Sequence, residues 1–148
     1  MRFTVIAVDT NILVYAHRAD SPFHERARSA LETLAAGAWP WAIPWPCAHE
    51  FFAIVTHPRI YKTATPAETA FAQLRALQTL DTLAFITEND DHLQRLELLA
   101  LTAKVQAGAI HDARIAAICL SHGVAELWSA DRDFSRFPSL AVRNPLIG

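Results

Sequence analysis

Short apolar runs with β propensity alternate along this chain with longer segments of helical periodicity. The runs lie at Phe3–Val8, Ala42–Ile43, Ala84–Thr87, Glu126–Ser129 and Leu140–Val142. Strands that alternate with helices form right-handed βαβ units, which here build a mostly parallel sheet of about four to five strands. Because ligands bind such sheets beyond the carboxyl ends of the strands, we expect the functional residues of this α/β fold at that edge.

Capping and breaking residues divide the rest of the chain into helices. Thr65 and Glu68 have the spacing of a capping box, with a proline between them in the first turn. Gly37 and Gly123 are expected to end helices, because glycine adopts the backbone conformations that close a helix. The expected helices begin near Ile12 and otherwise cover about residues 24–36, 46–57, 66–80, 91–106 and 111 or 112–121.

The composition indicates one packed domain. At 148 residues the chain has the commonest size of a single domain, 1–148, and its 52% hydrophobic content favours a globule over disorder. No apolar run approaches the roughly 20 residues that a membrane-spanning helix needs. An early Asp9 argues against a secretory signal. We therefore expect a cytoplasmic protein with no membrane partner.

The charge balance restricts the class of partner. The chain has 13 basic and 15 acidic residues and a net charge of −2, which argues against a strongly cationic nucleic-acid binder whose affinity comes from counterion release. It leaves room for an enzyme that holds phosphates through bound cations and a local basic rim. The candidates for such a rim, for which solvated surface charge is an equal alternative, are Arg18, Arg59, Lys62, Arg132 and Arg136.

Four acidic residues sit on or beside apolar runs, namely Asp9, Glu50, Asp112 and Asp131. Carboxylates are rarely held against a core unless they are paired or bind a metal. Each one alone has a structural explanation, as a turn or N-cap residue, a helix-surface charge, a dipole partner or an Asx turn. Because three of them occupy comparable positions, after a strand or at the start of a helix, we expect all four to meet in one pocket.

Gathered carboxylates suit a hard divalent cation. Mg²⁺ and Mn²⁺ prefer oxygen ligands, and one or two such ions can clamp a phosphodiester and activate water for in-line attack. Without a cation, mutual repulsion would raise the pKa values of some of the acids. The pattern therefore predicts a metal-dependent enzyme that acts on phosphodiesters.

The same residues resemble the motifs of PIN-domain ribonucleases. Segment 8–14 resembles the opening strand and first acid of that family, and His49-Glu50-Phe51 resembles its second motif. Segment 111–124 resembles the third motif, and segment 129–134 the fourth. The motifs occur in the family order over nearly the whole chain, and they are most similar to the VapC-type toxins of bacterial toxin–antitoxin pairs.

The resemblance implies a three-layer α/β/α sandwich and Mg²⁺- or Mn²⁺-dependent cleavage of RNA. Carried over by motif, the catalytic acids and metal ligands would be Asp9, Glu50, Asp112 and Asp131. Asp9 and Asp112 are the strongest candidates for direct ligands, and Glu50 and Asp131 would act through water or on a second ion. The resemblance also implies a cognate antitoxin as the protein partner and a homodimer.

Three further residues near these acids have supporting roles in this interpretation. Thr10 and Asn11 would orient Asp9 or the substrate, and capping of the first helix is an equally good explanation. Asp133 offers a second carboxylate two positions after Asp131. We take Asp131 as the site residue and Asp133 as a helper or a cap.

Histidine and tryptophan side chains near the motifs have plainer explanations. His111 could serve as a general base, but water activated by a metal needs no protein base, so we expect a packing or hydrogen-bonding role. Trp39, Trp41 and Trp45 could stack on nucleic-acid bases. We favour a place for them at a core edge or an oligomer interface.

Two other functions stay open from the residues alone. Asp9 follows a strand, as the nucleophile of a small-molecule phosphohydrolase would, but no second Asp lies two positions later to act as acid and base. A non-catalytic interaction module could have an acidic pocket as well. Such a module would show no metal-dependent turnover of nucleic acid.

Overall fold

A computed structural model describes residues 5–147 of the chain. The predicted first strand is confirmed from Ile6, whereas Phe3 and Thr4 lie outside the described residues. Two short 3-10 helices, η1 and η2, accompany the α-helices and strands. The elements are β1 (Ile6–Val8), α1 (Thr10–His17), α2 (His24–Ala36), β2 (Trp41–Pro44), α3 (Trp45–Val55), α4 (Ala67–Gln78), β3 (Leu83–Ile86), α5 (His92–Thr102), η1 (Ala107–Ala109), α6 (Ile110–Ser121), β4 (Glu126–Trp128), η2 (Arg132–Arg136) and β5 (Ala141–Arg143).

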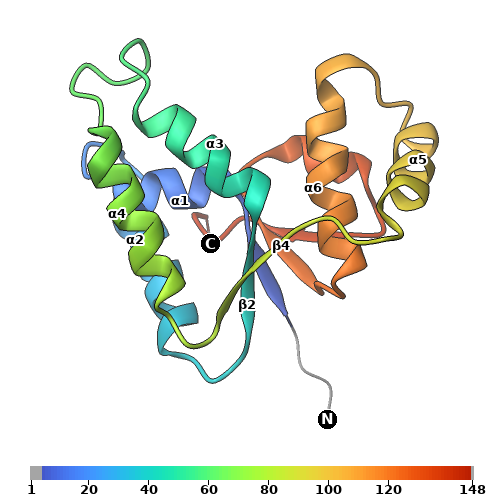
Figure 1. The fold of residues 1–148 in the computed structure, drawn as a ribbon, viewed down its shortest axis with the longest axis horizontal. Coiled ribbons are helices and arrows are strands. Elements are labelled where there is room, and N and C mark those ends of the chain that lie inside the picture. Colours follow the sequence, from blue (N-terminus) through green and yellow to red (C-terminus); the bar gives the residue numbers. More distant parts are fainter. Residues whose placement is uncertain (1–4, 148) are drawn as a thin grey trace.

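The strands of the described chain form a five-stranded sheet in the order β3-β2-β1-β4-β5, and every pair is parallel. The chain runs from β1 to β2 and β3, and then returns across the sheet to β4 and β5. Because parallel crossovers are right-handed, these two directions place their helices on opposite faces. Figure 1 shows α1 to α4 on one side of the strands and α5 and α6 on the other. The predicted α/β/α sandwich is confirmed.

The carboxyl ends of β1 and β4 lie side by side at the centre of the sheet. Val8 is the register partner of Trp128, and the amide of Asp9 donates to the carbonyl of Trp128 at 3.0 Å. The next residue of each strand, Asp9 and Ser129, therefore meet at the same edge. The direction of the chain reverses at this point, which is where open α/β sheets place their ligands.

The burial of helix α6 fixes the position of its first turn relative to this edge of the sheet. Five consecutive residues, Ile115–Cys119, and also Ala113, are buried. A helix is buried on so much of its surface only when it is covered from two sides, and α6 contacts both α5 and β2. Its first turn carries Asp112, so the packing of α6 sets the position of that acid.

Trp41 lies in the core, and Trp45 is partly buried against it. Trp41 is 1% exposed, and its indole donates to the hydroxyl of Thr82 at 3.0 Å. The ring of Trp45 stacks on Phe85 with 4.5 Å between the centroids. Trp39 is 48% exposed. The interpretation of Trp41 and Trp45 as packing residues is confirmed.

Two helix boundaries differ from the sequence predictions. The capping box is wrong: the N-cap residue of α4 is Pro66, and the hydroxyl of Thr65 instead accepts a hydrogen bond from Arg18 at 3.2 Å and lies 3.1 Å from the His17 ring. Helix α5 ends at Thr102 instead of about residue 106, and Lys104 follows with a positive φ of 55°. Tertiary contacts and a tight turn set these boundaries, and neither leaves a periodic signal.

The helices are short relative to a bilayer. The 13 residues of α2 span about 20 Å at the rise of an α-helix, whereas a bilayer core is about 30 Å thick. Over residues 5–147, no helix combines the length and the apolar character that crossing a membrane requires.

Two glycines allow a matched test of the backbone at the end of α6. Gly123 has a φ of +68°, Gly108 does not have a positive φ, and an added Cβ meets no atom within 4 Å at either position. Gly123→Ala should lower the free energy of unfolding by about 1 kcal/mol, because an L-residue is strained in the left-handed region. Gly108→Ala should be neutral or slightly stabilising. Urea denaturation of both variants measures the difference, and equal effects would contradict a conformational role for Gly123.

Candidate active site

Asp9 is a buried carboxylate held at the end of the central strand. It occupies the N-cap position of α1 with extended backbone angles, but its side chain does not cap the helix. Instead, Oδ2 accepts from the hydroxyl of Ser129 at 2.7 Å and from the amide of Asn11 at 3.3 Å, and Oδ1 accepts from the thiol of Cys47 at 3.4 Å. The residue is 4% exposed. Burial raises the pKa of Asp9, although these hydrogen bonds oppose the rise.

Ser129 connects the ends of β1 and β4, and the sequence analysis gave it no role. Its hydroxyl donates to Asp9 and accepts from the backbone amide of Asp131 at 3.0 Å and from the Asn11 amide at 3.3 Å. The residue is 2% exposed. The available signal was its place directly after β4, which corresponds to the place of Asp9 after β1. The hydroxyl of Ser129 thus holds both the side chain of Asp9 and the backbone of Asp131 in place.

Thr10 and Asn11 contact the site as expected, and neither caps α1. Asn11 bridges the two strand ends, because its amide donates to Asp9 and its carbonyl oxygen accepts from the amide of Ala130 at 3.1 Å. The Thr10 hydroxyl donates to Glu50 Oε2 at 3.2 Å. Glu50 lies on α3 and is exposed, and its pKa is raised by partial desolvation and then by the charges of Asp9 and Asp131.

Asp112 experiences the strongest crowding of like charges among these acids. It lies in the first turn of α6 and is partly buried. Desolvation raises its pKa to about 6, with further contributions from Asp131, Asp9 and Asp133, while Arg136 acts in the opposite direction. The raised pKa of Asp112 therefore reflects burial first and the neighbouring negative charges second.

Asp131 and Asp133 both reach Asp112. One carboxylate oxygen from each of Asp112, Asp131 and Asp133 lies within 4.8 Å of the others. Asp131 Oδ1 accepts from the amide of Asp133 at 2.8 Å, an Asx-type bond that opens η2. Asp133 is exposed and lies 3.9 Å from Arg136. Asp131 and Asp112 line one pocket, and Asp133 is not among its lining residues.

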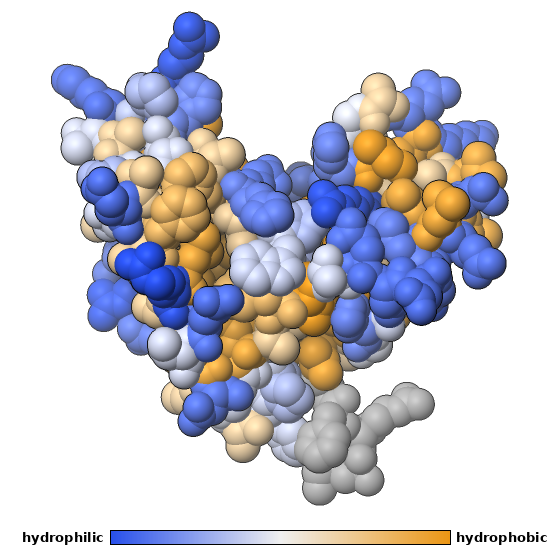
Figure 2. All heavy atoms as spheres, in the orientation of Figure 1, coloured by the Kyte–Doolittle hydropathy of each residue, from blue (hydrophilic) through white to orange (hydrophobic). Residues whose placement is uncertain are grey.

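The four acids predicted from the sequence converge on one pocket of about 280 Å³. An apolar wall faces them, and it includes Val14 and Ile54. Figure 2 shows the molecule hollowed between α3 and α4 on one side and α5 and α6 on the other. The full lining is Asp9, Thr10, Asn11, Val14, Tyr15, Glu50, Ile54, Ile60, Tyr61, Asp112, Ile115 and Asp131.

This donor set fits a hard divalent cation. Among the described residues, no Lys or Arg lines the pocket, so the carboxylates have no compensating charge of their own. Burial raises the pKa values of Asp9, Glu50 and Asp112, and the charges of neighbouring acids raise them further. Oxygen-only ligands favour Mg²⁺ or Mn²⁺ over zinc. A larger hollow of about 470 Å³ lies elsewhere, beside α2, and Glu25 is the single acid among its described lining residues.

The basic residues considered for a phosphate path have different environments. Arg18 is engaged by Asp20 at 2.6 Å and by the carbonyl of Thr63 at 2.8 Å, and it lies over the ring of Tyr61. Arg59 and Lys62 are exposed on the connection between α3 and α4. Three neighbours thus hold Arg18, and its guanidinium connects the residue after α1 to the segment between α3 and α4.

The remaining two basic residues lie near the acids. Arg132 lines a neighbouring hollow that shares Asp131 with the acid pocket. Arg136 lies near Asp133 and lowers the pKa of Asp112. Both are placed to act on the edge of the pocket and not within it.

Comparison with known proteins agrees with this architecture. The chain matches the PIN domain over residues 6–140. It is 34% identical over 144 residues to Ribonuclease VapC43 of Mycobacterium tuberculosis, with 97% of each chain covered. It is 29% identical over 140 residues to Ribonuclease VapC48 of the same organism, with 95% of this chain and 97% of the relative covered.

Solved structures show the same fold. The crystal structure of VapBC2 from Rickettsia felis, bound to a DNA fragment from its promoter, matches with a TM-score of 0.69 and 22% identity, and it covers 95% of this chain and 98% of that chain. The sarcin–ricin loop cleaving toxin VapC20 of M. tuberculosis matches with a TM-score of 0.62 and 20% identity, over 88% and 92% of the two chains. Because the PIN match spans most of the sequence and VapC43 aligns from end to end, this chain belongs to the PIN-domain family and to its VapC ribonucleases.

Proposed function

We propose that this protein is a divalent-cation-dependent endoribonuclease that acts in the cytoplasm as the toxin of a toxin–antitoxin pair. The observation that carries the proposal is the convergence of Asp9, Glu50, Asp112 and Asp131, from four separate segments, on a pocket with no basic lining residue among those described. Relatives that align over nearly the whole chain are named ribonucleases. The proposed cation is Mg²⁺ or Mn²⁺.

The proposed roles of the acids follow from how each one is held. Asp9 is the most constrained, because Ser129 and Asn11 fix one of its oxygens and burial limits its motion. Asp112 is set by the packing of α6. We propose these two as direct ligands, Glu50 and Asp131 as ligands through water or on a second ion, and Asp133 as a helper at the edge. A cation in this pocket would supply Lewis-acid chemistry toward a phosphodiester and an activated water.

The protein's own residues prepare this site in two ways. Ser129, Asn11 and Thr10 orient the carboxylates, and oriented ligands reduce the reorganisation that binding requires. The apolar wall, which includes Val14 and Ile54, lies beside the acids, and apolar surroundings strengthen electrostatic interactions.

The geometry does not favour Asp9 as the nucleophile of a phosphohydrolase. Ser129 and Asn11 both donate to its Oδ2, and because position 11 is Asn, no second Asp lies two positions later to act as acid and base. A non-catalytic module is equally disfavoured, because the relatives named ribonucleases align over almost the full chain.

An antitoxin and a second copy of the chain are the proposed protein partners. Solved relatives include toxin–antitoxin complexes from Rickettsia felis, Klebsiella pneumoniae and Salmonella typhimurium, which supports an antitoxin. Three leucines of α5, Leu93, Leu98 and Leu101, are 75%, 68% and 72% exposed, and Figure 2 shows hydrophobic side chains gathered over this helix. An exposed apolar surface of this kind supports self-association.

The first test is RNA cleavage by the wild type and by Asp9→Asn. The wild type should cleave RNA with Mg²⁺ or Mn²⁺ and stop when EDTA is added. Asp9→Asn should lose activity by about 100-fold or more, because it removes a ligand charge while preserving the shape of the side chain. Asp20→Asn is the matched control, since Asp20 is an exposed partner of Arg18, and it should retain activity. Cleavage that resists EDTA, or an active Asp9→Asn variant, would overturn the proposal.

The second test is the stability of the metal-free protein at two pH values. The folded-state pKa of Asp112, about 6, lies above its ordinary value of 3.8, so its ionised form destabilises the fold at high pH. This penalty is complete above pH 6 and disappears as the pH falls from 6 toward 4. Asp112→Asn should therefore unfold at higher urea concentration than the wild type at pH 8, by about 1–2 kcal/mol, and by roughly half as much at pH 5.

The same substitution at Asp20 provides the control for this test. Arg18 lowers the pKa of Asp20, so Asp20→Asn should not stabilise the protein at either pH. An Asp112→Asn variant that is no more stable than the wild type at pH 8 would show that burial and the neighbouring acids do not destabilise the ionised Asp112 as described.

A further inference from the structure

A second groove opens beside the acid pocket, between α3 and α6. Its volume is about 390 Å³, compared with about 280 Å³ for the acid pocket. Glu50 and Ile115 line both, so the two hollows adjoin at these side chains. The groove is lined by Pro46, His49, Glu50, Ala53, His111, Arg114 and Ile115.

The polar side chains of this groove are mainly hydrogen-bond donors, whereas those of the acid pocket are mainly carboxylates. Its polar lining consists of two exposed imidazoles, His49 and His111, and the guanidinium of Arg114, with Glu50 at the shared wall. His111 was expected to have a packing or hydrogen-bonding role, but its exposure contradicts packing. Imidazole and guanidinium nitrogens are hydrogen-bond donors suited to phosphate oxygens.

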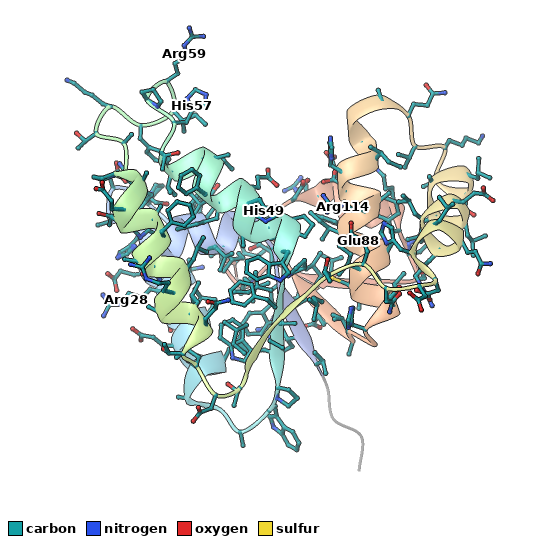
Figure 3. The ribbon with its side chains drawn as sticks, viewed as in Figure 1. Arg28, His49, His57, Arg59, Glu88 and Arg114 are labelled. Atoms are coloured by element: carbon teal, nitrogen blue, oxygen red, sulfur yellow. The ribbon has the colours of Figure 1, made fainter. Side chains whose placement is uncertain are left out.

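Two of these donors are held in place by neighbours outside the groove. Arg114 donates to Glu88 Oε2 through Nε at 3.0 Å and through Nη2 at 2.9 Å. Burial alone would raise the pKa of Glu88, but hydrogen bonds from the backbone, Thr87 and Arg114 hold it at about 2, so the pair stays ionised. The ring of His49 lies 6.0 Å from that of Trp45. Figure 3 shows His49 on α3 and Arg114 on α6, on facing sides of the gap.

We propose that this groove binds the RNA backbone next to the scissile linkage, through hydrogen bonds from His49, His111 and Arg114 to a phosphate. The proposal rests on the proposed nuclease function. An RNA strand that places one phosphodiester in the acid pocket must place its neighbours outside it, and there the carboxylates would repel them unless donors face them. Contacts of this kind position a nucleic acid without reading its sequence.

The hollow on the other side of the acid pocket is a weaker candidate. It shares Asp131 with the pocket, and Arg132 is the single cationic residue among its described lining residues. The groove between α3 and α6 instead has three donors on two helices that also carry proposed site acids, Glu50 and Asp112. The packing of these two helices therefore sets the positions of the donors relative to the acids.

The test compares two double variants that remove the same residue types. His49→Gln with Arg114→Gln changes the groove. His57→Gln with Arg28→Gln is the matched control, because His57 is exposed just beyond α3 and Arg28 pairs with Glu32 at 2.9 Å, as Arg114 pairs with Glu88. Figure 3 places His57 and Arg28 away from the gap between α3 and α6. Thermal unfolding checks that both variants are folded.

The probes are a fluorescein-labelled 20-nucleotide single-stranded RNA in EDTA, for binding, and purified ribosomal RNA with Mn²⁺, for cleavage. The groove variant should bind the short RNA about 10-fold more weakly, with a shallower dependence on salt. In cleavage, its KM should rise by a similar factor while kcat stays within about twofold. The control variant should match the wild type in RNA affinity, in the salt dependence of binding, in KM and in kcat. His49→Gln alone, which leaves the Arg114–Glu88 pair intact, should show a smaller change in the same direction.

The outcomes separate this proposal from the nuclease proposal. Wild-type cleavage together with unchanged KM and RNA affinity in the groove variant would overturn the groove and leave the nuclease intact. A fall in kcat at constant KM would also overturn it, because it would indicate disturbance of Glu50. Unchanged RNA binding with weaker association of the co-expressed antitoxin would overturn it in favour of a protein site. A wild type that binds RNA through the groove but does not cleave it would overturn the nuclease proposal alone.

Discussion

The hydrogen bond from Ser129 to Asp9, at 2.7 Å, joins the ends of the two strands on which the site is built. It lies where the chain reverses its direction across the sheet, so it ties the first segment of the fold to one of the last. A carboxyl group that is 4% exposed needs such partners, because an unsatisfied buried polar group is costly. The positions of Asn11 and Asp131 depend on the same hydroxyl.

Two other acids, Glu50 and Asp112, reach the site from helices on opposite faces of the sheet (Figure 1). Helix α3 brings Glu50 toward Thr10, and the buried helix α6 brings Asp112 toward Asp131. The raised pKa values of Asp9, Glu50 and Asp112 indicate that the fold tolerates an electrostatic cost at this edge. Sites that are prepared for a ligand commonly reduce stability in this way. A bound cation would offset the cost, and the proposed phosphate contacts in the groove would complete the charge balance with RNA in place.

Much of the fold follows from local patterns in the sequence. The alternation of strands and helices predicts the parallel sheet, and strand ends beside apolar runs point to Asp9 and Asp131. The pattern could not identify Ser129, because a serine after a strand is common and its partner lies 120 residues away. It also assigned Thr65 to a cap, whereas Arg18 and His17 contact its hydroxyl from α1 and the residue after it. Long-range side-chain contacts of this kind have no periodic signature. The sequence pattern did not predict the groove either, because His49, His111 and Arg114 come together only when α3 packs beside α6.

The central claim is that uncompensated carboxylates at the carboxyl edge of the sheet form a site for a divalent cation. Calorimetric titration of Mn²⁺ at pH 6, in two buffers with different ionisation enthalpies, tests it most directly. Because Asp112 has a pKa of about 6 and ligands must be deprotonated to bind, the expected result is saturable binding with release of protons, strongly weakened by Asp9→Asn. Absence of saturable binding, or binding without proton release that Asp9→Asn does not alter, would contradict the claim.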